Sequence, residues 1–172
     1  MSKSLRAAGS DREAMVEIVR EHYATVYRFC ARRIGPDLAQ DAAQETFVSA
    51  QGSLRRFDGR SSLRTWLLGI AHNHCRNLAR KARPEESWLN EDEMNTEAMD
   101  GGARTILNRQ ALRQAMAGLT PEHREAVILH ELDGLTYEEA AKIAGVPAGT
   151  IKSRLYYAFE QLRKSLTEEG AK

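Results

Sequence analysis

The sequence predicts an all-α protein of two small helical domains joined by an extended acidic linker. Apolar residues recur at three- and four-residue steps through most of the chain, which is the period of an amphipathic helix. Charge is segregated: residues 1–83 hold 15 Lys and Arg against 8 Asp and Glu, residues 84–105 hold 1 against 7, and residues 106–172 hold 9 of each. We therefore expect domains at 1–83 and 106–172 and a linker at 84–105, with the basic domain better suited to phosphates.

Composition excludes several classes of protein. A hydrophobic fraction of 42% over 172 residues is enough for folded cores. No apolar run reaches the roughly 18 residues that cross a bilayer, and the N-terminal residues do not resemble a signal peptide, so we expect a cytoplasmic protein with no membrane insertion. Two cysteines, Cys30 and Cys75, are too few for a disulfide framework and fit a reducing compartment.

The first two helices follow from apolar stripes and from the residues that end them. Apolar residues between 15 and 30 form one stripe on a helix that should end near residues 35–36, a Gly-Pro pair. Asp37 is expected to cap a second helix, which carries Phe47 inward and stops around Gly52.

A turn-rich stretch at 56–62 separates the second helix from a third. The third helix should run from about 63 to 83, where Pro84 ends it. The acidic stretch that follows has no sustained period, which is why it is interpreted as a linker.

Two further helices open the C-terminal block. Thr120 can cap a helix that has Pro121 at its first position and runs to Leu132, whose side chain we expect to face the core. Thr136 and Glu139 have the spacing of a capping box, which predicts a short helix from that point.

Ala141, Gly145 and Ile151 have the spacing of a helix-turn-helix, because a small residue, a left-handed turn and a β-branched anchor let two helices cross closely. The helix after the turn should bury an apolar side, toward which Phe159 also lies: Ile151, Leu155, Ala158, Leu162 and Leu166. Its outward side, near the N-terminal end, offers hydrogen-bond donors and aromatic rings suited to a DNA major groove: Lys152, Ser153, Tyr156 and Tyr157.

The stretch HNHCRN at 72–77 raises the question of a metal site. His72 and His74 lie about 200° apart on a helix, so they cannot hold one ion together. His72 and Cys75 have a usable spacing, but no second pair completes a site, and we expect neither a metal nor a nuclease centre. His74 should face the packed side with Cys75 at its margin, whereas the polar side carries His72, Asn73, Arg76, Arg80 and Arg83.

Taken together, these segments resemble the extracytoplasmic-function (ECF) type of bacterial RNA polymerase sigma factor. The stretches YRFCARRIG (27–35), DLAQDAAQETFVSA (37–50) and RFDGRSSLRTWLLGIAHNHCRNLARK (56–81) resemble sigma region 2. The stretch LTPEHREAVILHELDGLTYEEAAKIAGVPAGTIKSRLYYAFEQLR (119–163) resembles region 4. The resemblance implies a non-catalytic, cofactor-free factor that binds core RNA polymerase and directs initiation at specific promoters.

The resemblance also implies roles for individual residues. Residues of the second helix would dock on the polymerase clamp: Asp41, Gln44 and Glu45. A loop would capture a base flipped from the minus-10 element: Asp58, Gly59, Arg60, Ser61 and Ser62. The third helix would contact the same element: His72, Asn73, Arg76, Asn77 and Arg80. The helix after the turn would contact the minus-35 duplex: Thr150, Lys152, Ser153, Arg154, Tyr156 and Tyr157.

Relatives commonly have a basic residue late in that last helix, where this sequence has Tyr157, so its minus-35 preference is expected to differ. The acidic linker would thread toward the active-site cleft and RNA exit channel, and an anti-sigma factor is an expected partner. The alternatives are an autonomous helix-turn-helix regulator with an N-terminal sensing domain, and an enzyme such as a nuclease. The sequence identifies neither the promoter nor the inducing signal.

Overall fold

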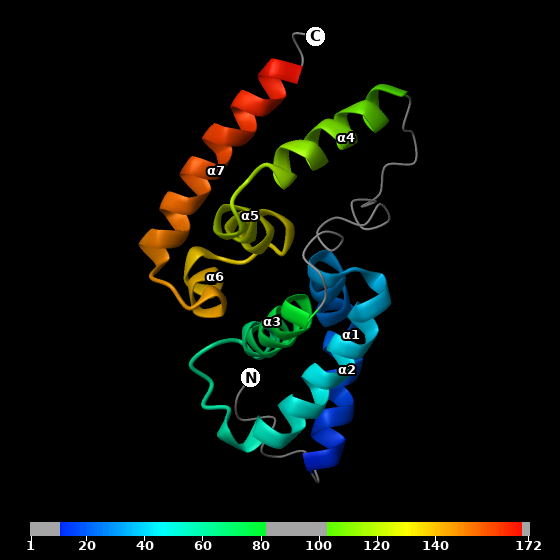
Figure 1. Cartoon of the computed structure of the whole chain (residues 1–172). Coiled ribbons are helices and arrows are strands. Elements are labelled where there is room, and N and C mark those ends of the chain that lie inside the picture. The colour runs from blue at the N-terminus through cyan, green and yellow to red at the C-terminus, as the bar shows by residue number, and fades with distance from the viewer. Residues whose placement is uncertain (1–10, 82–102, 170–172) are drawn as a thin grey trace. The chain divides into compact units, whose positions relative to one another are not determined.

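The structure is a computed structural model that describes residues 11–81 and 103–169, and every regular element in those ranges is helical (Figure 1). The chain divides into two compact units, residues 1–94 and 95–172. The all-α, two-domain prediction is confirmed. The acidic stretch lies outside the described residues up to residue 102, so its extended form and the domain limits at 83 and 106 stay predictions.

The first unit is a bundle of three helices: α1 (Asp11–Ile34), α2 (Pro36–Ser53) and α3 (Leu63–Lys81). Each helix packs against the other two, and a short 3-10 turn, η1 (Leu54–Arg56), follows α2 (Figure 1). Phe29, Leu67 and Leu68 are among the largest side chains of its core. Burying residues of this size stabilises by about 1.5 to 3 kcal/mol each relative to exposure.

The junction of α1 and α2 corrects one prediction. Gly35 occupies the cap position with a φ of 79°, Pro36 is in the first turn, and no side chain caps the helix. The capping role assigned to Asp37 is therefore wrong. Proline has a φ suited to the first helical position and lacks an N–H that would need a partner, so the helix begins one residue before Asp37 could cap it. Asp37 instead places a carboxylate in the first turn, where the helix dipole favours it.

The second unit consists of α4 (Ala103–Ala117), α5 (Pro121–Val127), a π-helical turn η2 (Ile128–Leu132), α6 (Tyr137–Ala144) and α7 (Ala148–Glu169). Helix α7 packs against α4, α5 and α6, and its buried residues are Ile151, Leu155, Ala158 and Leu162. Helix α4 was not predicted from the sequence as a separate element. It begins at Ala103, inside the range assigned to the linker.

Local capping chemistry in this unit agrees with the sequence. The Thr120 side chain accepts a hydrogen bond from the His123 backbone N–H at 3.3 Å. Thr136 and Glu139 form the predicted capping box, with both reciprocal hydrogen bonds present. Gly145 ends α6 in the left-handed conformation with a φ of 70°. These caps satisfy backbone groups that a helix end leaves without partners.

Three apolar residues expected on packed sides are not buried: Leu132, Phe159 and Leu166, the last of which is 39% exposed in α7. Leu132 is 45% exposed because the chain passes through a π turn, and Leu135, 1% exposed, fills the core instead. Phe159 is 41% exposed because it lies one residue beyond Ala158, which is at the centre of the buried side of α7.

The Arg124 side chain, in α5, donates hydrogen bonds to backbone carbonyls at the C-terminal end of α4 and just after it. Its Nε donates a hydrogen bond to the Met116 carbonyl at 2.9 Å, and its Nη2 donates to the carbonyls of Ala117 and Leu119 at 2.7 and 2.9 Å. A cation at a helix C-terminus also complements the helix dipole.

Replacing Arg124 by Met should destabilise the second unit by about 2 kcal/mol, because half-buried carbonyls lose charged donors. Trp66 lies in α3 of the first unit, and a Trp88→Phe background makes it the sole tryptophan. Urea unfolding followed by circular dichroism should therefore show the shift, while the tryptophan transition should not move. Arg163→Met is the matched control, since Arg163 is an exposed residue of α7 that forms a surface ion pair with Glu160, and such pairs contribute little to stability. Equal effects from the two variants would contradict the role given to Arg124.

Candidate nucleic-acid interface

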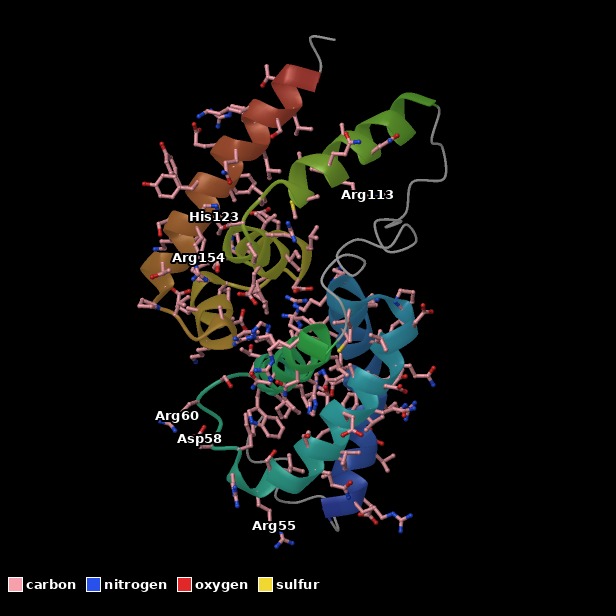
Figure 2. The ribbon with its side chains drawn as sticks, viewed as in Figure 1. Arg55, Asp58, Arg60, Arg113, His123 and Arg154 are labelled. Atoms are coloured by element: carbon pink, nitrogen blue, oxygen red, sulfur yellow. The ribbon has the colours of Figure 1, made fainter. Side chains whose placement is uncertain are left out.

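The loop between η1 and α3 is held in shape by its own side chains. The Asp58 carboxylate accepts a hydrogen bond from the Arg60 backbone N–H at 3.0 Å and forms an ion pair with the Arg60 guanidinium. Gly59, between them, has a φ of 73°, which favours glycine. Figure 2 shows Asp58 and Arg60 projecting from this loop, away from the helices of the first unit.

The far end of the loop is anchored to α3. The Ser62 hydroxyl accepts a hydrogen bond from the Thr65 backbone N–H at 3.0 Å, which caps the helix. The Phe57 and Trp66 rings pack with centroids 5.1 Å apart. The loop is thus an exposed, polar structure fixed at both ends.

Arg60 favours the ionised form of the Asp58 carboxylate. The backbone and side-chain hydrogen bonds from Arg60 hold the pKa of Asp58 below its ordinary value. Because the carboxylate is paired with the arginine beside it, the loop presents hydrogen-bonding groups to a ligand rather than a lone negative charge.

The outer face of α3 carries most of the polar stripe that the sequence predicts. Asn73, Arg76, Asn77 and Arg80 are exposed. Arg80 donates a hydrogen bond to the Asn77 side-chain oxygen at 2.8 Å, which holds a guanidinium and an amide together one turn apart. Two arginines and two amides on one face provide donors for phosphates and for base edges.

His72 does not belong to this face, which corrects the sequence analysis. It is 3% exposed, and burial, with further contributions from Arg33 and Arg76, lowers its pKa to about 4. The cause is the width of the packed side: α3 contacts both α1 and α2, so a second row at 68, 72 and 75 is buried beside the row at 67 and 71. His72 is a core residue and is not available to DNA.

The remaining residues of HNHCRN agree with the sequence analysis. His74 is half-buried and its Nε2 lies 2.9 Å from the Ser49 hydroxyl, joining α3 to α2. Cys75 is 2% exposed. Within the two described ranges, no three His, Cys, Asp or Glu side chains gather in a way that could hold a metal ion.

The exposed side of α2 carries the acidic and amide residues expected to dock on a protein. Asp41, Gln44 and Glu45 are all exposed. Val48 follows on the same side of the helix and is 64% exposed, a residue that the sequence analysis missed although its spacing of three from Glu45 could have revealed it. One apolar side chain beside three polar ones is a composition suited to a protein partner.

The helix-turn-helix prediction is confirmed in the second unit. Ala141 and Ile151 are 7% and 0% exposed on either side of the turn at Gly145. The outward side of α7 has Lys152 and Ser153 exposed, with Tyr156 and Tyr157 at 65% and 58%.

Two residues predicted to lie on the outward side of α7 are less exposed to solvent than the other four. Thr150 and Arg154, the latter labelled in Figure 2, are half-buried. The Ser153 hydroxyl donates to the Thr150 carbonyl at 3.0 Å, so its proton is already used within the helix.

Side chains from other helices also contact the exposed side of α7. These contacts were not predicted from the sequence. The His123 ring, from α5, stacks on Tyr157 with centroids 6.2 Å apart, and its Nδ1 lies 3.3 Å from the Gln161 side-chain oxygen. The Lys152 Nζ lies 5.2 Å from the ring centroid of Tyr137, at the start of α6. These partners are far apart in sequence, so no periodicity could reveal them.

Each of the two units matches the model of a known protein family. The model of "Sigma-70 region 2" matches residues 18–85 and that of "Sigma-70, region 4" matches residues 109–162. No helix in the part of the chain that the structure describes has the length and apolar character needed to cross a membrane.

Similar curated proteins include the ECF RNA polymerase sigma factor SigC of Mycobacterium tuberculosis, 36% identical over 92% of this chain and 86% of that protein. The ECF RNA polymerase sigma-E factor of Escherichia coli is 31% identical over 91% of this chain and 88% of that protein. Among solved structures, the sigma factor RpoE in complex with the anti-sigma factor NepR from Bartonella quintana is 28% identical with a TM-score of 0.62, covering 88% of this chain and 95% of that one. CnrH, in complex with the cytosolic domain of CnrY, is 25% identical with a TM-score of 0.65, covering 93% and 91%.

Proposed function

This chain belongs to the sigma-70 family of RNA polymerase sigma factors, in the ECF group, and from that membership we propose that it binds core RNA polymerase and directs promoter-specific initiation. The observation that carries the function is the order of two family matches, each on its own compact unit. The protein then acts as a specificity subunit in the cytoplasm and has no catalytic centre of its own.

We assign the minus-10 element to the first unit. The fixed loop at 58–62 offers a rim for an extruded base, and the adjoining face of α3 offers Arg76 and Arg80 to the phosphates and Asn73 and Asn77 to the bases. Base extrusion costs a few kcal/mol, so a loop that is already ordered is an advantage because little further ordering is needed on binding. His72 has no part in this contact.

The minus-35 duplex is assigned to the second unit. An α-helix fits the major groove, and the N-terminal half of α7 presents Lys152, Ser153, Tyr156 and Tyr157 to it. The aromatic ring of Tyr157, which is 58% exposed, offers an apolar surface to a thymine methyl group. Thr150 and Arg154 remain proposed contacts at the edge of this surface.

The exposed side of α2 is proposed to dock on the polymerase, with Val48 added to Asp41, Gln44 and Glu45. An anti-sigma factor is the second proposed protein partner, because both similar solved structures above are complexes with a second protein, which in the RpoE complex is the anti-sigma factor NepR. The passage of the acidic linker toward the RNA channel remains a prediction from sequence.

Run-off transcription with purified core polymerase tests this function. Promoter-specific transcripts should appear only when the protein is added to core enzyme. An autonomous helix-turn-helix regulator would instead bind duplex DNA tightly without polymerase, and that result would overturn the proposal.

Lys152→Ala should weaken minus-35 occupancy by the holoenzyme, by about 1 to 3 kcal/mol if the lysine contacts a base. Lys164→Ala is the matched control, because Lys164 is exposed on the same helix three turns further on. Footprinting of the minus-35 region at several holoenzyme concentrations measures the difference. An unchanged footprint with Lys152→Ala would remove this residue from the interface.

A further inference from the structure

A column of side chains links the π turn to the start of α7. The His130 Nδ1 lies 2.7 Å from the Leu135 carbonyl oxygen, which fixes the imidazole against the backbone. The His130 ring stacks on the Tyr137 ring, with centroids 4.4 Å apart and planes 19° apart. The Lys152 Nζ lies 5.2 Å from the centroid of the same Tyr137 ring.

Each member of the column is placed by a different element. His130 is half-buried in η2, Tyr137 is half-buried in the first turn of α6, and Lys152 is exposed in the first turns of α7. Tyr137 directly follows Thr136, which the capping box holds in place. The phenol ring is therefore fixed both by its backbone and by the imidazole stacked on it.

Lysine is a flexible side chain, and fixing it when DNA binds costs conformational entropy. An aromatic ring attracts an ammonium group within about 6 Å of its centroid. A ring held in place by α6 and η2 therefore restricts Lys152 before DNA arrives and lowers the entropy lost on contact.

We propose that Tyr137, supported by His130, is a positioning residue that holds the Lys152 ammonium in place for the minus-35 duplex. The proposal rests on the function given above, in which Lys152 contacts DNA, and adds a determinant that lies outside the recognition helix. Tyr137 acts through Lys152 and need not touch a base.

A double-mutant cycle in the holoenzyme tests the proposal, using full-length wild type, Tyr137→Leu, Lys152→Ala and the double variant. Minus-35 protection should weaken about two- to fivefold in Tyr137→Leu when Lys152 is present. The same substitution should have little effect in the Lys152→Ala background, because the ammonium is already gone. Tyr137→Phe, which keeps the ring, should behave like wild type, and His130→Ala should weaken protection in the same direction as Tyr137→Leu.

An NMR measurement on the free protein distinguishes the contact between Tyr137 and Lys152 from the proposed contact between Lys152 and DNA. The ε-methylene protons of Lys152 should show an upfield ring-current shift by NMR that survives in Tyr137→Phe and disappears in Tyr137→Leu. An absent shift, or equal weakening by Tyr137→Leu in both backgrounds, would overturn the positioning role. If the shift is present but Lys152→Ala leaves minus-35 protection unchanged, the DNA contact proposed for Lys152 has failed, and the positioning role falls with it.

Discussion

Lowering the pH from 6.5 towards 4 should destabilise the three-helix unit by up to about 3 kcal/mol, because His72 is buried in the neutral form. Burial is the largest cause of its lowered pKa, followed by the positive charges of Arg33 and Arg76. Arg33 is itself 5% exposed, with its guanidinium over the Phe29 ring and donating to the Phe29 carbonyl at 2.9 Å. A proton on His72 would therefore add a second buried cation.

The direction follows from proton binding in the two states. Between pH 6.5 and about 4 the unfolded chain binds a proton at residue 72 and the folded chain does not, so acid favours unfolding across this window. Above pH 6.5 the contribution to stability is complete, and below about 4 it has been lost.

Urea unfolding followed by tryptophan fluorescence at pH 7, 6 and 5, in a Trp88→Phe background, measures this loss, since the remaining tryptophan, Trp66, lies in α3. His72→Gln should flatten the pH dependence even if it lowers stability at pH 7. His72→Leu gives a second non-titrating variant should the glutamine fail to fold. His123→Gln, in the other unit, is the control and should keep the wild-type slope. An identical slope in wild type and in both His72 variants would contradict the assignment.

Replacing Arg76 and Arg80 together by Gln should weaken holoenzyme binding to a pre-melted promoter about 10- to 100-fold at low salt, because the two phosphate contacts proposed for these residues would be lost. The slope of log affinity against log salt should fall in magnitude by about 2. Titration at several salt concentrations, with core polymerase in excess, provides both quantities.

The matched control replaces Arg20 and Arg28, two exposed arginines of α1, by Gln, which changes the charge equally on another helix. A similar salt slope for both double variants would indicate a general effect of charge and would argue against contacts from α3. The loss of Arg76 should also raise the pKa of His72 toward its ordinary value, because one of the nearby cations is gone.

Helix caps and turns that depend only on residues close in sequence could be predicted. Thr120, the Thr136–Glu139 capping box and Gly145 act within a few residues of themselves, so their sequence pattern contains the whole interaction. The same holds for Asn73, Arg76, Asn77 and Arg80, whose exposure follows from the helical period once the packed side is known.

The errors arose where a distant element decides the outcome. The helical rotation of about 100° per residue gave the direction of His72 relative to its neighbours on α3. It could not show that two helices cover α3 and widen its buried side. The ring contacts of Tyr137 with Lys152 and of His123 with Tyr157 join separate helices, so they depend on the tertiary fold. Asp37 was a local error, since the preceding Gly-Pro pair already determines where α2 begins.

The π turn at Ile128–Leu132 sets how the residues after it are rotated about the helix axis relative to α5, which precedes it. Its backbone bond from the Asp133 N–H to the Ile128 carbonyl, 2.9 Å, spans one residue more than an α-helical bond does. One residue corresponds to about 100° of rotation around a helix axis. A change of one residue in chain length at this turn would therefore re-aim the helix-turn-helix relative to α5 without changing any side chain of α7. Under the proposed minus-35 contact, we expect promoter preference to depend on turn length as well as on side-chain identity.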